Sequence, residues 1–239
     1  TALVVTENLR PSLERENLAL NTRRLDSILV AQQDLFASSA RDWAVWDSAF
    51  EYARSPGRDF ERENLVADTF ESLEIHFLVF VDPEGEILPG KGYDSQKRQW
   101  VDPPGSLLDV LSNVASGKRS RMDGKGRQGI LSLPGGLFLV AGHPILKSDG
   151  SGPPAGSLFM VRRIDEAFLE DISKQAGNPV SLLPLSAAEV PVRLLLEAEE
   201  AGRPAEYRIE KDMVAGYLLV RDLSGVPIAA MKFLLPRQI

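Results

Sequence analysis

A carboxylate and three aromatic side chains recur at helical spacing near residue 45. Trp43, Trp46, Asp47 and Phe50 stand at positions i, i+3, i+4 and i+7, so one continuous helix would present all four on a single face. A carboxylate is costly to bury among rings unless it has a partner. The pattern predicts a pocket in which Asp47 holds a cationic or hydroxylated ligand against the two indoles.

Three further side chains are candidate walls of this pocket. His76 lies in the first, and Tyr93 and Asp94 in the second, of two consecutive strand-like runs. Each carries a side chain that can hydrogen-bond a polar ligand.

A structural interpretation of Asp47 competes with the pocket. In it, Asp47 accepts hydrogen bonds from backbone N–H groups near Asn64 or pairs with Arg58 or Arg62, and the aromatic rings are plain core. Structural networks also place charges beside apolar faces. The two interpretations differ in whether the substitution Asp47→Asn removes ligand binding or lowers stability.

Residues typical of an enzyme or a metal centre do not converge in the sequence. The chain has two histidines, His76 and His143, and no cysteine. Neither histidine lies beside a nucleophile motif or in a paired metal-ligand spacing, so serine catalysis and zinc binding are not indicated. We expect a non-enzymatic protein without a cofactor. A hydrolase that uses carboxylates such as Asp47 and Asp68 is the alternative.

Composition narrows the class of protein. The net charge of −7 and the pI near 5.0 give no broad electrostatic footprint for nucleic acid. No apolar run approaches the ~20 residues of a membrane helix. The chain begins at Thr1 without Met, and we expect it to be part of a longer protein. One basic cluster is interpreted as a solvated loop: Lys118, Arg119, Arg121, Lys125 and Arg127.

The first quarter of the chain favours a long helix. From about Pro11 to Ala53 apolar residues recur at spacings of three, four and seven, among them Leu18, Leu25 and Leu29. At ~1.5 Å per residue such a helix is ~60 Å long, which exceeds a small domain. We therefore expect part of it to project or to pair with a partner helix in a homodimer. Ser38–Ser39 is an alternative start for a second helix.

The middle of the chain predicts a sheet. Ile75–Asp94 reads as a β-hairpin with a turn at Asp82–Gly85, preceded by a short helix. A helix capped by Ser106 follows, and then three strands. The order of two strands, a helix and three strands fits a five-stranded antiparallel sheet whose last strand returns beside the first, as in PAS and Cache domains. The predicted segments are Asn64–Leu73 (helix), Ser106–Ala115 (helix), Gln128–Leu133, Leu137–Leu146 and Gly156–Ile164.

The rest of the chain predicts a second, smaller sheet unit. A helix over Asp165–Ala176 precedes strands at Val180–Leu185, Glu206–Lys211, Val214–Asp222 and Pro227–Leu235, with a further helix near 190–200. The fold class is α+β. The predicted parts are the long helix (1–55), the PAS/Cache-like domain (56–164) and the smaller α+β subdomain (165–239).

Several motifs, taken together and in order, resemble the type-four CHASE domain. They are RDWAVWD (41–47), NLVADTF (64–70), FLVFVD (77–82), GKGYD (90–94) and GILSLP (129–134). The resemblance implies a periplasmic sensor domain, held between two membrane helices absent from this chain, that precedes a HAMP, diguanylate cyclase, phosphodiesterase or histidine kinase module. His76 stands where the family tends to carry Asn, and Gly142-His143 is another departure.

A second spacing resembles the amino-acid-binding signature of double Cache receptors. Tyr93, Arg98 and Trp100 match it, and in those receptors the Arg holds a carboxylate while aromatic residues wall the pocket. Val101 replaces the aromatic residue that normally follows. A solvated loop is the alternative interpretation.

The sequence thus predicts a ligand-sensing domain outside the cytoplasm that passes ligand binding to a cytoplasmic output. A structural dimerisation spacer without a ligand is the remaining alternative. The predicted ligand-binding residues are Trp43, Trp46, Asp47, His76, Tyr93 and Asp94, with Asp68, Arg98, Trp100 and His143 as further candidates.

Overall fold

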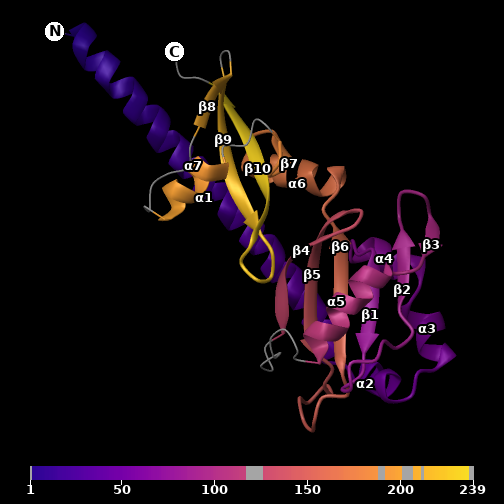
Figure 1. Cartoon of the computed structure of the whole chain (residues 1–239). Coiled ribbons are helices and arrows are strands. Elements are labelled where there is room, and N and C mark those ends of the chain that lie inside the picture. Colours follow the sequence, from indigo (N-terminus) through magenta and orange to yellow (C-terminus); the bar gives the residue numbers. More distant parts are fainter. Residues whose placement is uncertain (1, 117–125, 188–191, 201–206, 211–212, 237–239) are drawn as a thin grey trace. The chain divides into compact units, whose positions relative to one another are not determined.

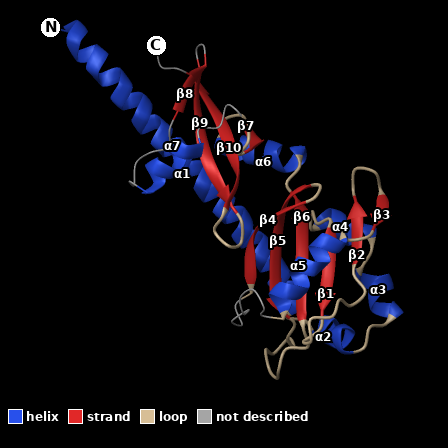
Figure 2. Ribbon diagram, viewed as in Figure 1, coloured by secondary structure: helices blue, strands red, loops and turns tan. Residues whose placement is uncertain are grey.

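The computed structural model describes residues 2–116, 126–187, 192–200, 207–210 and 213–236 (Figures 1 and 2). Contacts divide the chain into two compact units. Unit 1 joins Thr1–Ala31 to Asp165–Ile239, and unit 2 is Gln32–Ile164. The three-part division with boundaries at 55 and 164 remains a prediction from sequence. The basic cluster near 120 lies outside the described residues except for Arg127.

Helix α1 (Ala2–Ala44) contributes residues to both units. In unit 1, Leu18 and Leu25 are each only 1% exposed, and a Cβ added to Gly216 would meet the Leu18 side chain. Arg24 donates a 2.8 Å hydrogen bond to the carbonyl of Gln175. The apolar stripe of α1 is therefore covered within the chain, which corrects the expectation that a partner helix would be needed to cover it.

Unit 2 is built on one antiparallel sheet with the strand order β3-β2-β1-β6-β5-β4 in the described residues. The last strand, β6, returns beside the first, with Leu78 opposite Met160, as the sequence predicted. The elements of unit 2 after α1 are α2 (Asp47–Arg54), α3 (Arg58–Asn64), α4 (Ala67–Ser72), β1 (Phe77–Val81), β2 (Lys91–Asp94), β3 (Gln99–Val101), α5 (Gly105–Ala115), β4 (Arg127–Leu133), β5 (Gly136–Pro144) and β6 (Ser157–Arg163).

The α+β fold class is confirmed, and the sheet has one more strand than predicted. Strand β3 is short and lies at the sheet edge beside β2. The single helix predicted over Asn64–Leu73 is instead the end of α3 followed by α4. Helix α5 begins at Gly105 after Pro104, with no side-chain cap, so the predicted cap by Ser106 is wrong.

The β1–β2 connection is wider than a tight hairpin. Only Phe77 and Leu78 of β1 pair with β2. The predicted turn is present, because Asp82 Oδ1 accepts from the N–H groups of Glu84 (3.0 Å) and Glu86 (2.8 Å). Gly85 has φ 95°, a conformation that glycine adopts at little cost.

Helices cover the sheet of unit 2 through aromatic and polar contacts. Tyr52 of α2 lies with its ring centroid 4.9 Å from that of Phe80 in β1. Near the end of α1, Asp34 accepts a 2.6 Å hydrogen bond from Gln128 of β4. All five residues of β1 are buried, which agrees with the apolar residues on both faces of this strand in the sequence. Helix α5 contacts β1 and crosses the face of the sheet in Figure 2.

Unit 1 contains a second antiparallel sheet with the order β7-β10-β9-β8 in the described residues. The helix predicted over Asp165–Ala176 is α6, and Asp165 caps it by accepting from Phe168 N–H at 3.1 Å. Part of the apolar core gathers Leu195, Ala215, Tyr217 and Ala230. The elements are α6 (Glu166–Ala176), β7 (Val180–Pro184), α7 (Val192–Glu200), β8 (Tyr207–Glu210), β9 (Met213–Arg221) and β10 (Pro227–Pro236).

Candidate functional site

The helix expected to carry the first pocket is interrupted. Helix α1 ends at Ala44 and α2 begins at Asp47, with Trp46 extended between them (φ −149°, ψ 129°). Val45 instead pairs with Leu146, whose N–H donates to Ala44 O at 3.0 Å. The prediction that Trp43, Trp46 and Asp47 lie on one face of a continuous helix is therefore wrong.

Asp47 is an exposed residue of the first turn of α2. Its N–H donates to Ser148 Oγ at 3.1 Å, and its Oδ1 accepts from Ser148 N–H at 2.9 Å. This reciprocal pair joins α2 to the β5–β6 connection. The partner is thus Ser148 rather than the backbone near Asn64 or the side chains of Arg58 and Arg62.

The two tryptophans begin a row of rings. Trp43 and Trp46 meet edge to face with centroids 5.9 Å apart, and Trp46 lies 5.9 Å from Phe60. Phe60 stacks on Tyr52 at 4.5 Å. The Tyr52 hydroxyl donates to the carbonyl of Pro89 at 2.9 Å. Burial, and secondarily the neighbouring Glu61 carboxylate, raises the pKa of Tyr52 above its usual range, so this phenol stays protonated.

His76 and Tyr93 are brought together by the backbone of the sheet. Tyr93 N–H donates to His76 O at 2.9 Å, and His76 N–H donates to Val161 O at 2.8 Å. The backbone N–H of Arg163 donates a hydrogen bond to the ring nitrogen Nδ1 of His76, with 3.2 Å between the two nitrogens. His76 therefore helps to hold β2 and β6 on either side of β1.

Four side chains converge on the β2–β3 hairpin, and we call Phe70, Tyr93, Arg98 and Trp100 the hairpin cluster. Tyr93 and Trp100 face each other across the two strands, with centroids 5.2 Å apart. Phe70 of α4 meets the Trp100 ring at 5.6 Å and 90°. Lys91 Nζ lies 5.3 Å from the same ring, a cation–π distance.

Arg98 brings a positive charge into the hairpin cluster. It adopts φ 53° at the hairpin turn. A hydrogen bond to Tyr93, and then the carboxylate of Glu71, raise the pKa of Arg98 above its ordinary value, with a smaller contribution from Asp68. Tyr93 is 4% exposed whereas Trp100 is 51% exposed, so the phenol ring of the cluster is buried and the indole is accessible to solvent.

Asp94 stabilises the same hairpin turn. Its Oδ1 accepts from Lys97 N–H at 2.9 Å, and its Oδ2 lies 3.1 Å from Lys97 Nζ. The backbone N–H of Lys97, followed by the Lys97 side chain, lowers the pKa of Asp94. Both oxygens of this carboxylate thus have partners within its own turn.

His143 lies in β5 and is 6% exposed. Its Nδ1 is 2.9 Å from the carbonyl oxygen of Pro144, so Nδ1 carries the proton that this bond requires. Burial lowers the pKa of His143, and the charge of Arg41 acts in the same direction. The neutral ring is a buried part of the sheet.

The structure does not bring the ten predicted site residues together in one site. It gathers Tyr93, Arg98 and Trp100, with the Asp68 carboxylate near Arg98. Sequence reasoning missed Phe70 and Glu71 in this group, although both lie in or beside the NLVADTF motif. Among the described residues, no group of His, Asp and Glu could hold a metal ion, and no helix has the length and apolar character needed to cross a membrane.

The chain combines a PAS-like antiparallel sheet with flanking helices, a long N-terminal helix and a second sheet unit. A model of the CHASE4 domain family matches residues 28–183. The chain belongs to the CHASE4 domain family, which confirms the resemblance found in its motifs.

Similarity to characterised proteins agrees with this assignment. The chain is 26% identical over 218 residues to the methanogenesis regulatory histidine kinase FilI of Methanothrix harundinacea, covering 89% of this chain and 24% of the kinase. This chain thus spans about a quarter of that relative.

Two solved structures share the fold. The periplasmic domain of Vibrio cholerae LuxQ has a TM-score of 0.53 at 12% identity, covering 93% of this chain and 99% of that domain. The ligand-binding domain of the Campylobacter jejuni chemoreceptor Tlp3, in complex with L-valine, has a TM-score of 0.54 at 9% identity, covering 97% of this chain and 95% of the other. At these identities the likeness concerns the fold alone.

Proposed function

We propose that this chain is the extracytoplasmic ligand-sensing region of a membrane-bound signalling protein. Membership of the CHASE4 family and similarity to part of a histidine kinase support the proposal, as does a fold shared with a periplasmic domain. The change on ligand binding is passed to a cytoplasmic output module. The similarity to FilI favours a histidine kinase as this module, and a diguanylate cyclase or phosphodiesterase is the alternative. The domain itself is non-enzymatic.

The ligand site we propose is the hairpin cluster. The observation that carries it is the convergence of Tyr93, Arg98 and the half-exposed Trp100 on one hairpin. A guanidinium holds a carboxylate in bidentate geometry, an indole covers an apolar side chain, and the carboxylates of Asp68 and Glu71 suit an ammonium group.

This combination suits an α-amino acid. The solved Tlp3 domain, which shares the fold, was crystallised with L-valine. Tyr93 donates its hydroxyl to a bound carboxylate once Arg98 has turned toward the ligand.

Thermal unfolding with a panel of L-amino acids tests this site. The wild type should gain stability with one or more of them, by about 2.7 kcal/mol when the free ligand is ~100 times Kd. Arg98→Gln should lose that response while keeping the unliganded melting temperature within about 2 °C. Trp100→Ala should also lose the response, and it should melt at a lower temperature because it removes the ring contacts with Tyr93 and Phe70. Arg62→Gln, at an exposed arginine of α3 paired with Asp59, is the control and should respond as the wild type does. A full response in Arg98→Gln would contradict the assignment.

The proposal extends to a homodimer through α1, by a face other than the covered stripe. Leu20 and Val30 are 58% and 48% exposed, which is costly for large apolar side chains in water. Sedimentation of Leu20→Glu should show weaker self-association than the wild type. The same sedimentation mass for Leu20→Glu and the wild type would refute this contact.

A further inference from the structure

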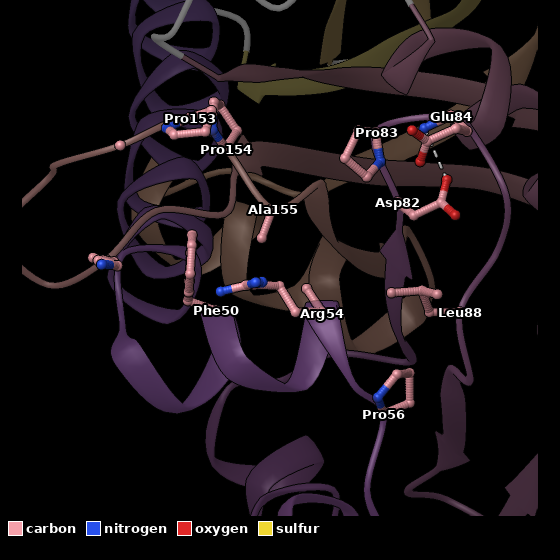
Figure 3. A pocket seen from close by; sticks show the side chains of 13 residues that line it. Phe50, Arg54, Pro56, Asp82, Pro83, Glu84, Leu88, Pro153, Pro154 and Ala155 are labelled. Atoms are coloured by element: carbon pink, nitrogen blue, oxygen red, sulfur yellow. Dashed lines mark hydrogen bonds between the residues drawn. The ribbon is translucent and has the colours of Figure 1, made fainter.

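A second concave site lies in unit 2 at the end of α2. It encloses about 630 Å³, which is within the ~300–1,000 Å³ of small-molecule sites. Figure 3 shows Phe50 and Arg54 on α2, with the Arg54 side chain extending toward Phe50; Pro153–Ala155 lie above them in the view, and Asp82–Glu84 and Leu88 lie on the other side of the cavity. We call this cavity the α2 pocket.

Two cations share one aromatic ring in the α2 pocket. Arg54 Cζ is 5.9 Å and Lys147 Nζ is 5.7 Å from the centroid of Phe50, and both side chains line the cavity. Phe50 itself is buried. The Phe50 ring therefore lies within cation–π distance of two positive charges at one wall.

Neither cation forms an ion pair within the part of the chain that the structure describes. The ion pairs there do not include Arg54 or Lys147. Asp149, in the same connection as Lys147, uses its Oδ1 to accept from Ser151 N–H at 2.8 Å, and its lowered pKa owes more to Ser151 than to the charge of Lys147. Two positive charges at one wall of the cavity attract an anion.

The other walls limit what the anion can be. Pro153, Pro154 and Leu88 present apolar surface. On the far side, Asp82 already accepts from two N–H groups of its own turn, and the Glu84 side chain adds a second negative charge. A ligand with anions at both ends would be repelled there.

We propose that the α2 pocket binds a small organic monocarboxylate with an apolar body. The carboxylate lies between Arg54 and Lys147, and the hydrocarbon part lies against the prolines and Leu88. This site goes beyond the sensing function assigned to the hairpin cluster, and its ligand needs no ammonium group.

Calorimetric titration of the 239-residue chain with hexanoate, hexanamide and adipate tests the proposal. Hexanoate should bind about tenfold more tightly than its neutral amide, because the charge-assisted contacts are lost in the amide. Adipate, with a carboxylate at each end, should bind more weakly than hexanoate. Equal binding of hexanoate and hexanamide, or tighter binding of adipate, would overturn the proposal.

Substitutions locate the binding. Arg54→Gln and Lys147→Gln should each weaken hexanoate binding about fivefold, and the double variant should weaken it more than either. Arg193→Gln, at an exposed arginine paired with Glu197 in unit 1, changes the net charge equally and should bind as the wild type does. Melting curves of all variants separate unfolding from lost affinity. If the double variant is folded and still binds hexanoate with wild-type affinity, the α2 pocket is not the site.

Discussion

The reciprocal bond between Asp47 and Ser148 sets the stability of the α1–α2 junction. Replacing Asp47 with Ala removes the acceptor of the Ser148 N–H and a negative charge from the first turn of α2. The lost hydrogen bond is worth about 1 kcal/mol. The lost interaction with the helix dipole adds about 0.5 kcal/mol at this exposed position.

A loss of about 1.5 kcal/mol lowers the melting temperature by about 3 to 6 °C for a chain of this size. Asp47→Asn keeps an oxygen acceptor and should lose about a third of this, because only the charge is removed. Ser148→Ala removes the other bond, the one from Asp47 N–H. Because the two residues are in direct contact, the loss in the double variant should differ from the sum of the two single losses.

Asp59→Ala is the matched control, because Asp59 also lies in the first turn of a helix but pairs with Arg62 in its own helix. Calorimetry of these variants and the wild type, with and without the amino-acid panel, decides the role of Asp47. If Asp47→Ala has the same melting temperature as Asp59→Ala but loses its ligand response, Asp47 is a ligand-binding residue and its structural role at the junction is refuted.

Two further perturbations probe the sheet of unit 2. Gly156→Ala should lower the free energy of unfolding by about 3 kcal/mol or more, because φ is 138° and the new Cβ would overlap the carbonyl oxygen of Val81. The control Gly150→Ala, at φ 72° with no atom within 4 Å, should lower it by only about 1 kcal/mol. Equal losses of the two variants in urea unfolding would contradict this prediction. His143 has a pKa below its ordinary 6.5, so below that pH the unfolded chain binds a proton that the folded chain resists, and stability falls with a slope of up to ~1.4 kcal/mol per pH unit. His143→Gln should flatten the decline between pH 7 and 5, and parallel curves for the two proteins would show that His143 does not titrate as inferred.

Much of the fold follows from local patterns in the sequence. The apolar run of β1, the Asp82–Gly85 turn and the Asp165 cap each specify their structure with residues that are adjacent in the chain. Strand β3 was not predicted because Gln99–Val101 is short, partly polar and at a sheet edge, where pairing with β2 decides the conformation.

The break between α1 and α2 had no signal in the sequence. Residues 41–50 contain neither Gly nor Pro. The helix stops where Leu146 N–H bonds to Ala44 O and Asp47 bonds to Ser148, both about a hundred positions away in the chain. Long-range bonds of this kind override helical periodicity. The spacing of Tyr93, Arg98 and Trp100 was visible because a single hairpin holds all three, whereas Lys147 approaches Phe50 only in the folded protein.

The division of α1 between the two units has a consequence for the order of folding. Unit 2 is one uninterrupted stretch, whereas unit 1 is assembled from both ends of the chain. During synthesis the residues of α1 that cover Gly216 must wait until β9 has been made. Closing that gap in an unstructured chain costs an entropy that grows with loop length, and prior folding of unit 2 brings its two ends to fixed positions and so shortens the effective loop. Unit 2 should therefore fold before unit 1.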